Sequence, residues 1–337
     1  MSELFKDFAR VWTAVMMSEG LPTGRPVGLT VAGTPVVFFR GPDGKPAALL
    51  DRCPHRGVAL SLGTVHEGRV ECPFHGWALD GQGRVCNVPW NPDAKLDALR
   101  GVSFPVVDLG GQLWLYTAPG PAPDEGPQVQ ELFVSPEYRV SGTVLEMRAH
   151  WSRVMENMLD WPHLPYVHTR TIGSAMRDRV KTGRMDISLE REPWGARTEI
   201  RIDGKEEKGR LDLRWPNQMN LFIPIPKQAL LLAATCVPVN DTHTRLLLVT
   251  ARRFLRPRVF DWFFNRMNLR IAQEDKAVVE SSFPVEIPPA RDEQSVRTDG
   301  PTLYFRKRYF AELKAPNSDA PPARRALPVL SDGRASS

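Results

Sequence analysis

The sequence predicts an α+β protein: a small antiparallel β domain followed by a larger domain with an antiparallel sheet and one long helix. Short strand-like runs separated by Gly and Pro turns fill residues 8–118, which is typical of a small β domain. Residues 119–127 contain four prolines and are expected to be a linker, because proline suits neither a helix interior nor a central strand. Beyond it, residues 128–314 contain alternating segments and then a helical period at 257–282.

Turn residues and apolar runs predict the elements of the first domain. Met1 to Glu19 is expected to form a short amphipathic helix. Strands are predicted at residues 27–31, 35–40, 47–51 and 77–80, from 85 onward and at 112–117. At the other end of the chain, residues 315–337 are rich in Pro, Ala, Ser and Arg and are expected to be a disordered tail.

Two half-sites in the first domain each combine a cysteine with a histidine. The first is Cys53-x-His55 and the second is Cys72-x-x-His75, with Pro and Gly beside each pair. Two thiolates can hold one iron of a [2Fe–2S] cluster while two imidazoles hold the other. A structural zinc site would use the same ligand types, but classical zinc fingers pair Cys with Cys and His with His. The mixed half-sites therefore favour the cluster over zinc.

Composition limits the compartment and the partners. The other cysteines, Cys86 and Cys236, are too few for a disulfide framework, and a thiolate-held cluster suits a reducing compartment. No apolar run approaches the ~20 residues of a membrane span, and no secretory signal is recognisable, so we expect a cytoplasmic protein. The net charge of +5 lacks a basic block interleaved with aromatics, which argues against nucleic acid. Instead, Arg52, Arg56 and Arg69 would steer an acidic electron donor toward the half-sites.

A second set of candidate ligands lies near the start of the larger domain. Asn157, Asp160 and His163 recur every three residues and are expected to share one helical face. His168 is off this period, and two intervening prolines disturb the helix, so a local break is needed to bring both imidazoles together. Taken alone, two such histidines are more often structural than ligands.

The long helix at 257–282 offers a third ligand. One i, i+4 stripe is apolar except for Asp275, and consists of Val259, Phe263, Met267, Ile271, Asp275 and Val279. A carboxylate directed at the core must be paired or bound to metal. Asp275 would either complete a 2-His-1-carboxylate iron site with His163 and His168 or pair with an arginine. Glu274 is expected on the solvated face, in line with Arg266 and Arg270.

Taken together, these motifs resemble the catalytic α-subunit of Rieske non-haem iron oxygenases over residues 8–314. The Asn-x-x-Asp-x-x-His-x-x-x-x-His run at 157–168 matches that family's mononuclear iron motif, and Glu-Asp-Lys at 274–276 resembles its late carboxylate ligand. The resemblance implies a helix-grip (START-like) catalytic domain whose sheet comes from segments 185–202, 209–223, 227–239 and 244–254. It implies a [2Fe–2S] cluster on Cys53, His55, Cys72 and His75, Fe(II) on His163, His168 and Asp275, and catalytic roles for Asn157 and Asp160.

Within that family the short chain resembles the homotrimeric branch, with vanillate demethylase and dicamba monooxygenase as likenesses, more than the α3β3 ring dioxygenases. This likeness implies that Asp160 bridges a cluster histidine of one subunit and an iron-ligating histidine of its neighbour. O2 would be the co-substrate. NAD(P)H would act only through a separate reductase or ferredoxin, since no G-x-G-x-x-G follows a strand here.

The expected reaction is hydroxylation, dihydroxylation or demethylation of a small apolar, aromatic molecule, and a polycyclic or terpenoid substrate is an alternative. Phe222, Ile223, Ile225, Leu230 and Leu232 fit either an apolar pocket or ordinary core. Asn217, Gln218 and Asn220 would bind substrate or, more often, cap strand ends. Outside the enzymes, the alternative is a Rieske electron carrier with a non-catalytic binding domain, which predicts no second iron.

Overall fold

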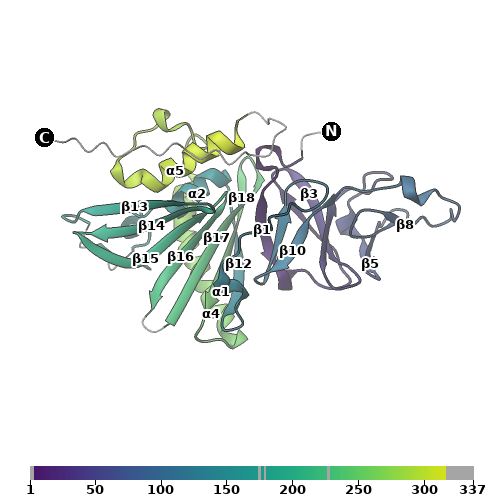
Figure 1. Cartoon of the computed structure of the whole chain (residues 1–337), viewed down its shortest axis with the longest axis horizontal. Coiled ribbons are helices and arrows are strands. Elements are labelled where there is room, and N and C mark those ends of the chain that lie inside the picture. Colours follow the sequence, from purple (N-terminus) through teal and green to yellow (C-terminus); the bar gives the residue numbers. More distant parts are fainter. Residues whose placement is uncertain (1–3, 174–175, 178–179, 226–227, 316–337) are drawn as a thin grey trace.

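The N-terminal part of the computed structural model consists of three small antiparallel sheets (Figure 1). The model describes residues 4–173, 176–177, 180–225 and 228–315. The first sheet has the order β1 (Trp12–Met17), β11 (Gln112–Tyr116), β10 (Val106–Leu109). The second has the order β2 (Val27–Val31), β3 (Thr34–Arg40), β4 (Pro46–Leu50), β9 (Ser103–Phe104). The third has the order β5 (Thr64–His66), β6 (Arg69–Glu71), β7 (Ala78–Leu79), β8 (Val85–Asn87).

The strands predicted in this part are confirmed within one or two residues, but the helix predicted before residue 19 is wrong. Apart from the short η1 turn, the described chain there forms β1, which pairs with β11 from Trp12↔Tyr116 to Met17↔Gln112. The adjacent residues Ala14 and Val15 are both fully buried and pack into different apolar clusters. A strand can bury both of its faces, and this tertiary packing overrides a helix-like pattern.

A single seven-stranded antiparallel sheet dominates the C-terminal part. Its order is β12-β18-β17-β16-β15-β14-β13, so that β12 lies beside the last strand of the chain. The strands are β12 (Arg139–Met147), β13 (Met185–Glu192), β14 (Gly195–Ile202), β15 (Lys205–Arg214), β16 (Gln218–Ile225), β17 (Gln228–Asn240) and β18 (His243–Arg252). The segment predicted at 185–202 is a hairpin of two strands, and the one at 209–223 also spans a turn between two strands. Residue 227 of the third predicted segment lies outside the described residues.

In the described parts of the chain, five α-helices accompany this sheet, together with short 3-10 and π turns. The helices are α1 (Glu131–Val134), α2 (Trp151–Leu159), α3 (Leu164–Val167), α4 (Asp261–Glu280) and α5 (Gly300–Arg308). The 3-10 turns are η1 (Lys6–Phe8), η2 (Ser18–Gly20), η3 (Leu60–Leu62), η4 (Leu96–Ala98), η6 (Arg258–Phe260), η7 (Ala290–Asp292) and η8 (Arg297–Asp299), and η9 (Tyr309–Leu313) is a π turn. The long helix α4 packs on β12 and β18, and α2 packs on β17 and α4. The predicted antiparallel sheet around a long helix is confirmed. The predicted tail, beyond Ala315, lies outside the described residues.

The buried face of α4 differs from the predicted stripe in its first half. Val259 and Phe263 are 76% and 51% exposed, whereas Phe264, Asn268, Ala272, Asp275 and Val279 are buried. Strict i, i+4 spacing advances about 400° per step on a helix of 3.6 residues per turn, so the stripe drifts about 40° at each step. The predicted residues therefore reach the core only toward the C-terminal end, where Asp275 lies.

The N-terminal and C-terminal parts are joined by apolar packing and by hydrogen bonds. Trp114 and Ala14 pack with Leu231 and Leu247 of the large sheet. The backbone N–H of Ala32 donates to the carbonyl of Pro238 at 2.7 Å, and the Asn217 amide donates to Thr13 Oγ1 at 2.9 Å. In Figure 1 the β5–β8 sheet lies at one end of the molecule, while α2 and α4 lie in the other half. Within the described residues, no helix is long and apolar enough to cross a bilayer.

Candidate metal centres

The two Cys-His half-sites lie on two loops with the same backbone design. In each loop the cysteine N–H donates to the carbonyl five residues later: Cys53 to Val58 at 2.8 Å and Cys72 to Trp77 at 2.9 Å. A glycine four residues after each cysteine donates back to that cysteine's carbonyl, and both glycines have positive φ, 73° at Gly57 and 70° at Gly76. Glycine adopts this left-handed conformation without steric cost, which explains its place in both motifs.

Within these loops the thiols and the imidazoles form separate pairs. Cys53 and Cys72 are buried, and burial followed by the proximity of Cys72 raises the pKa of Cys53. The rings of His55 and His75 lie nearer the surface, with centroids 4.7 Å apart, and His55 stacks on Trp77 at 4.5 Å. Nδ1 of His55 is buried and has no hydrogen-bond partner among the described residues.

This arrangement fits a two-iron cluster better than a single zinc ion. The four ligands of one zinc would all lie within about 4 Å of one another. Among the described residues, the only group of three such donors within 4.8 Å is a different one, His163, His168 and Asp275. A buried thiol pair and an outer imidazole pair match the two differently ligated irons of a Rieske cluster.

The chain around His163 and His168 is broken into two short helices, and the expectation of one helical face for Asn157, Asp160 and His163 is wrong. Helix α2 ends at Leu159, and Asp160 is extended with φ −84° and ψ 134°. His163 directly precedes α3 and His168 directly follows it. Proline at 162 removes a backbone donor and disfavours helical backbone in the residue before it, which accounts for the break.

This break brings three donor atoms of the predicted iron site together. His163 Nε2 lies 3.3 Å from His168 Nε2, and Asp275 Oδ1 lies 3.5 and 3.2 Å from these two atoms. Ligand bonds of about 2.1 Å at angles of about 90–110° place donor atoms about 3.0–3.4 Å apart. The spacing therefore fits one transition-metal ion.

The hydrogen bonds of the two Nδ1 atoms explain why the Nε2 atoms are able to bind a metal ion. Nδ1 of His163 lies 3.0 Å from Asp160 Oδ2, and Nδ1 of His168 lies 2.9 Å from Glu274 Oε2. Because a carboxylate accepts, each Nδ1 is placed to donate, which leaves each Nε2 able to offer its lone pair to a metal. Oδ1 of Asp275, 3% exposed as a residue, has no hydrogen-bond partner among the described residues. Three lone pairs thus converge on one buried point, and a bound cation would satisfy all of them.

The prediction that Glu274 lies on the solvated face of α4 differs from what the structure shows. Among the described residues its ion pair is with His168, and not with Arg266 or Arg270 as expected for a solvated face. Burial acts to raise the pKa of Glu274, but hydrogen bonds from Thr171 and His168 outweigh it and lower that pKa. Burial likewise acts to lower the pKa of His168, and Asp275 and Glu274 together raise it. The adjacent Glu-Asp pair at 274–275 was the available sequence signal.

The remaining predicted site residues lie in α2 and on both faces of the sheet. Asn157 lies in the last turn of α2, and its buried Nδ2 has no partner among the described residues. The register places Ile223 opposite Leu230 on the same side as Leu221 and Leu232, which pack with the core shared by α2 and α4. Ile225 belongs to the same side by alternation. Phe222 projects to the opposite side, where Arg210 stacks on its ring at 3.7 Å.

The three polar candidates on this sheet are held within the protein fold. Asn217 donates to Thr13 and to the carbonyl of Cys236, and Gln218 donates to Thr235 at 2.8 Å. Asn220 is fully buried and lies opposite Asp212 in the strand register, which places it on the side away from α2 and α4. Its amide has no hydrogen-bond partner among the described residues. The hydrogen bonds argue for structural roles at Asn217 and Gln218, whereas the position of Asn220 separates it from the metal-site residues.

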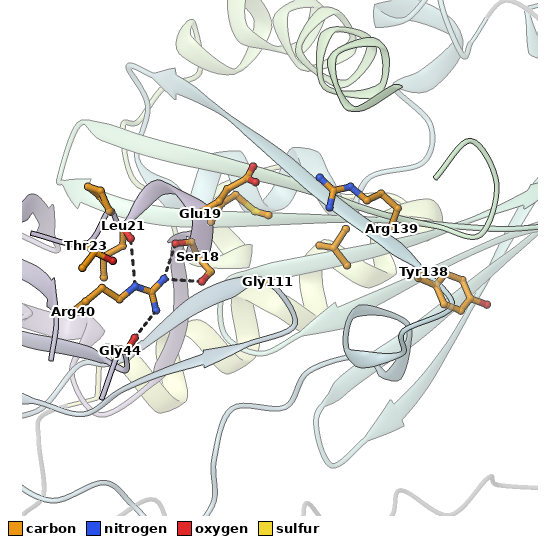
Figure 2. Close-up of a pocket in the computed structure, with 12 residues that line it drawn as sticks. Ser18, Glu19, Leu21, Thr23, Arg40, Gly44, Gly111, Tyr138 and Arg139 are labelled. Carbon is orange, nitrogen blue, oxygen red and sulfur yellow. Dashed lines mark hydrogen bonds between the residues drawn. The ribbon is translucent and has the colours of Figure 1, made fainter. Parts of the chain in front are cut away.

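A large cavity, about 690 Å³, lies away from the metal-site residues, where the N-terminal strands meet β12. Figure 2 shows Arg40 there with its guanidinium turned toward Ser18, Leu21 and Gly44. Arg40 also donates to Asp108 at 2.9 Å, so protein groups occupy its donors. The Arg40 guanidinium therefore has no free donor for a ligand in this cavity.

Comparisons with known proteins agree with these two centres. Residues 11–100 match the Rieske [2Fe-2S] domain, and residues 147–315, half of the chain, match the vanillate O-demethylase oxygenase C-terminal domain. The oxygenase component of dicamba O-demethylase from Stenotrophomonas maltophilia is 34% identical over 176 residues, which cover 50% of each chain. The oxygenase subunit of 3-chlorobenzoate-3,4-dioxygenase from Comamonas testosteroni is 31% identical over 172 residues, covering 50% of this chain and 39% of that protein. The chain thus aligns with half or less of these relatives' lengths.

Solved structures show the same fold over most of the chain. Dicamba monooxygenase bound to dicamba superposes with a TM-score of 0.75 at 22% identity, covering 90% of this chain and 97% of that one. NdmA of Pseudomonas putida CBB5 with caffeine gives a TM-score of 0.76 at 23% identity, covering 89% of both chains. The predicted fold class is confirmed, and the family implies a [2Fe–2S] cluster and a mononuclear iron. The chain belongs to the Rieske oxygenase family, in the group whose C-terminal domain is that of the vanillate O-demethylase oxygenase.

Proposed function

We propose that this protein is the oxygenase component of a multicomponent system that uses O2 to hydroxylate or oxidatively demethylate a small aromatic molecule. The observation that carries the proposal is the convergence of His163, His168 and Asp275 on one buried point. In this proposal residues 8–118 and 128–314 are the two working domains and residues 119–127 connect them. When bound, the mononuclear iron supplies O2 activation and substrate oxidation at its open coordination positions.

Cys53, Cys72, His55 and His75 would hold the cluster. The imidazole pair lies on the outer side of the loops, with His75 exposed, so electrons can enter from a separate reductase or ferredoxin. Arg52, Arg56 and Arg69 are exposed around this end and would steer an acidic donor toward it. A thiolate-held iron cluster suits a reducing compartment, which supports the cytoplasmic location that we propose.

Asp160 would connect the two centres between copies of the chain in a homotrimer. Its Oδ2 accepts from the backbone N–H of His163 at 2.8 Å and holds Nδ1 of the same residue, so the imidazole has a fixed orientation. Its side chain is 26% exposed and can reach a group outside its own subunit. Within one chain the cluster loops and α4 lie in opposite halves of the molecule (Figure 1), which favours transfer between chains.

An apolar substrate fits the side of the sheet that faces the metal centre. Leu221, Ile223 and Leu232 lie on this side, and they offer contacts to a ring but no charge. One relative named above acts on dicamba and another on 3-chlorobenzoate, as their names state, so a substituted aromatic is the proposed class. Asn157, whose amide has an unused donor beside this region, would orient the substrate or the oxidant.

The test is the iron and acid-labile sulfide content of anaerobically purified protein, with EPR of the dithionite-reduced form. We expect about three irons and two sulfides per chain and the low average g value of a histidine-ligated cluster. Two irons and two sulfides, unchanged by added Fe(II), would instead identify an electron carrier. Zinc without sulfide would contradict both functions. Oxygen uptake with substituted benzoates and a surrogate reductase then tests the substrate class.

A further inference from the structure

Helix α4 contacts His168 at both nitrogens of its ring. Asp275 Oδ1 lies 3.2 Å from Nε2, and Glu274 Oε2 lies 2.9 Å from Nδ1. Consecutive residues of a helix point about 100° apart, so two adjacent carboxylates can reach one ring from different sides. His168 itself is only 2% exposed, which leaves the ring between two fixed partners from one rigid element.

The same oxygen of Glu274 also holds the turn that follows His168. Thr171 Oγ1 donates to Glu274 Oε2 at 2.6 Å. The carbonyl of His168 accepts from the backbone N–H groups of Thr171 and Gly173 at 3.1 and 3.0 Å. Gly173 packs so tightly that a Cβ there would lie 1.9 Å from the carbonyl oxygen of Leu164. One carboxylate thus ties an imidazole and its supporting turn to α4.

The two carboxylate–imidazole pairs of the centre are not equivalent. Asp160 follows α2, binds the backbone of the histidine that it holds, and is 26% exposed on the outer side. Glu274 comes from α4, beside the carboxylate ligand itself, and is 19% exposed. Its partners are His168 and Thr171, which lies in the turn after His168. Glu274 therefore connects the proposed ligand Asp275 on α4 with the proposed ligand His168, which belongs to a different segment.

We infer that Glu274 is a positioning residue for iron retention: with Thr171 it fixes the tautomer and the orientation of His168, so that the iron site is formed before the metal binds. This inference rests on the proposed function. A carboxylate behind a histidine ligand raises its donor strength, and loss of such a partner typically lowers metal affinity about 10- to 100-fold. Glu274 would act on how tightly iron is held, whereas Asp160 would act on electron transfer.

The experiment compares Glu274→Ala and Glu274→Gln with the control Glu280→Gln in cluster-loaded protein. Glu280 is a matched control: it lies on α4, is 13% exposed, and accepts from the backbone N–H of Arg148 at 2.7 Å. Anaerobic Fe(II) titration and the rate of Fe(II) capture by a chelator report affinity. EPR of the nitric oxide-treated Fe(II) protein reports occupancy separately from the cluster.

For E274A we expect about 10- to 100-fold weaker Fe(II) binding and faster loss to the chelator, with unchanged sulfide content and cluster EPR. E274Q keeps an acceptor for Thr171 and should lose less Fe(II) affinity than E274A. The Fe(II) affinity of E280Q should match that of the wild type. We also expect Fe(II) to raise the melting temperature of E274A less than that of the wild type, a difference that a merely structural role would not produce.

Equal Fe(II) affinity of wild type and E274A would overturn the inference and leave the proposed function standing. An equal loss in E274A and E280Q would also overturn it, because the effect would then belong to the helix as a whole. A wild-type protein that binds no iron beyond the two of the cluster would overturn the proposed function and this inference together.

Discussion

His163 and His168 direct their Nε2 atoms at each other across 3.3 Å, with the unpaired Oδ1 of Asp275 beside both. A metal ion bound at this point would be held by both imidazoles and by this carboxylate oxygen. Asp275→Ala should therefore lower the iron content by about one per chain and leave acid-labile sulfide and the cluster EPR unchanged. Metal analysis of both proteins gives the answer. Unchanged iron in D275A would mean that the third iron is bound elsewhere.

The separation of the two centres within a chain predicts complementation between chains. A subunit with His75→Ala should lose the cluster, and a subunit with Asp275→Ala should lose the mononuclear iron, so each protein alone should be inactive. Coexpressed and purified as mixed assemblies, they should regain substrate-dependent oxygen uptake, because an intact cluster then lies beside an intact iron site of a neighbour. Uptake at background level in verified mixed assemblies would show that electrons stay within one chain.

Trp90 is expected to anchor contacts between copies. It is fully exposed and has a positive φ of 64°, which is uncommon for a large side chain. Its neighbour Pro89 lies against Gly76 of the second Cys-His loop, so Trp90 lies near that loop. Exposed tryptophans are enriched among residues that dominate interfaces. Trp90→Ser should weaken self-association by about 30-fold, equivalent to about 2 kcal/mol, as measured by analytical ultracentrifugation.

The control for this prediction is Val296→Ser, which changes another exposed apolar residue at the opposite end of the molecule. Val296 is 68% exposed and precedes Arg297, which pairs with Asp186 of β13. V296S should assemble like the wild type. Identical assembly of W90S and V296S would remove Trp90 from the interface.

The proposed cluster ligands could be selected from the sequence because they are close together along the chain. Cys53, His55, Cys72 and His75 lie on two short loops whose Pro and Gly residues fix the backbone. The proposed iron site could be predicted only in part. Asp275 was found as the single charge in an apolar stripe, although that stripe drifts around α4 and leaves Val259 exposed.

Other features depend on tertiary packing that no local pattern encodes. Glu274 could pair with arginines on its own helix, but the turn around Thr171 offers a closer set of donors. Similarly, the sequence of β1 has a pattern like that of an amphipathic helix. In the folded protein it is a strand, because its two faces pack into different apolar clusters. The side of the sheet on which Phe222 lies follows from strand register, which a single sequence does not specify outside a clear alternation.

A buried ion-pair network connects α5 with α2, the helix that precedes Asp160 and His163. Arg306 Nη2 donates to Glu156 Oε2 at 3.0 Å, and both side chains are about one-tenth exposed, at 8% and 12%. Burial raises the pKa of Glu156 against the effect of Arg306 and Arg153. Arg306→Met should cost about 2–3 kcal/mol of unfolding free energy, because Glu156 keeps only the partner Arg153. Urea denaturation measures the loss.

Two comparisons decide whether the ion pair is the cause. Lys307→Met changes an exposed neighbour of the same charge and should alter the unfolding free energy by less than about 0.5 kcal/mol. The double variant R306M/E156Q should be more stable than R306M, since no charge is then left buried without its partner. If the double variant is the less stable of the two, lost packing rather than an unpaired charge explains the effect.

His150 at the start of α2 predicts a dependence of stability on pH. Burial is the largest effect on its pKa and lowers it, with Lys314 in the same direction and Glu286, Asp241 and Asp7 opposing. A histidine in the unfolded chain titrates near pH 6.5. As the pH falls from about 7.5 through this value, the unfolded state binds the proton first, so the folded state loses stability until its own lower pKa is passed.

The variant His150→Asn separates this titration from the helix cap. Nδ1 of His150 accepts from the backbone N–H of Ser152, and asparagine supplies an equivalent acceptor as a favoured N-cap residue. H150N should therefore fold like the wild type at pH 7.5 and lose less unfolding free energy between pH 7.5 and 5.5. If the unfolding free energy of the two proteins falls with equal slope over this interval, His150 does not stay neutral in the folded state. The carboxylates that line the adjacent cavity of about 420 Å³ would then stabilise its protonated form.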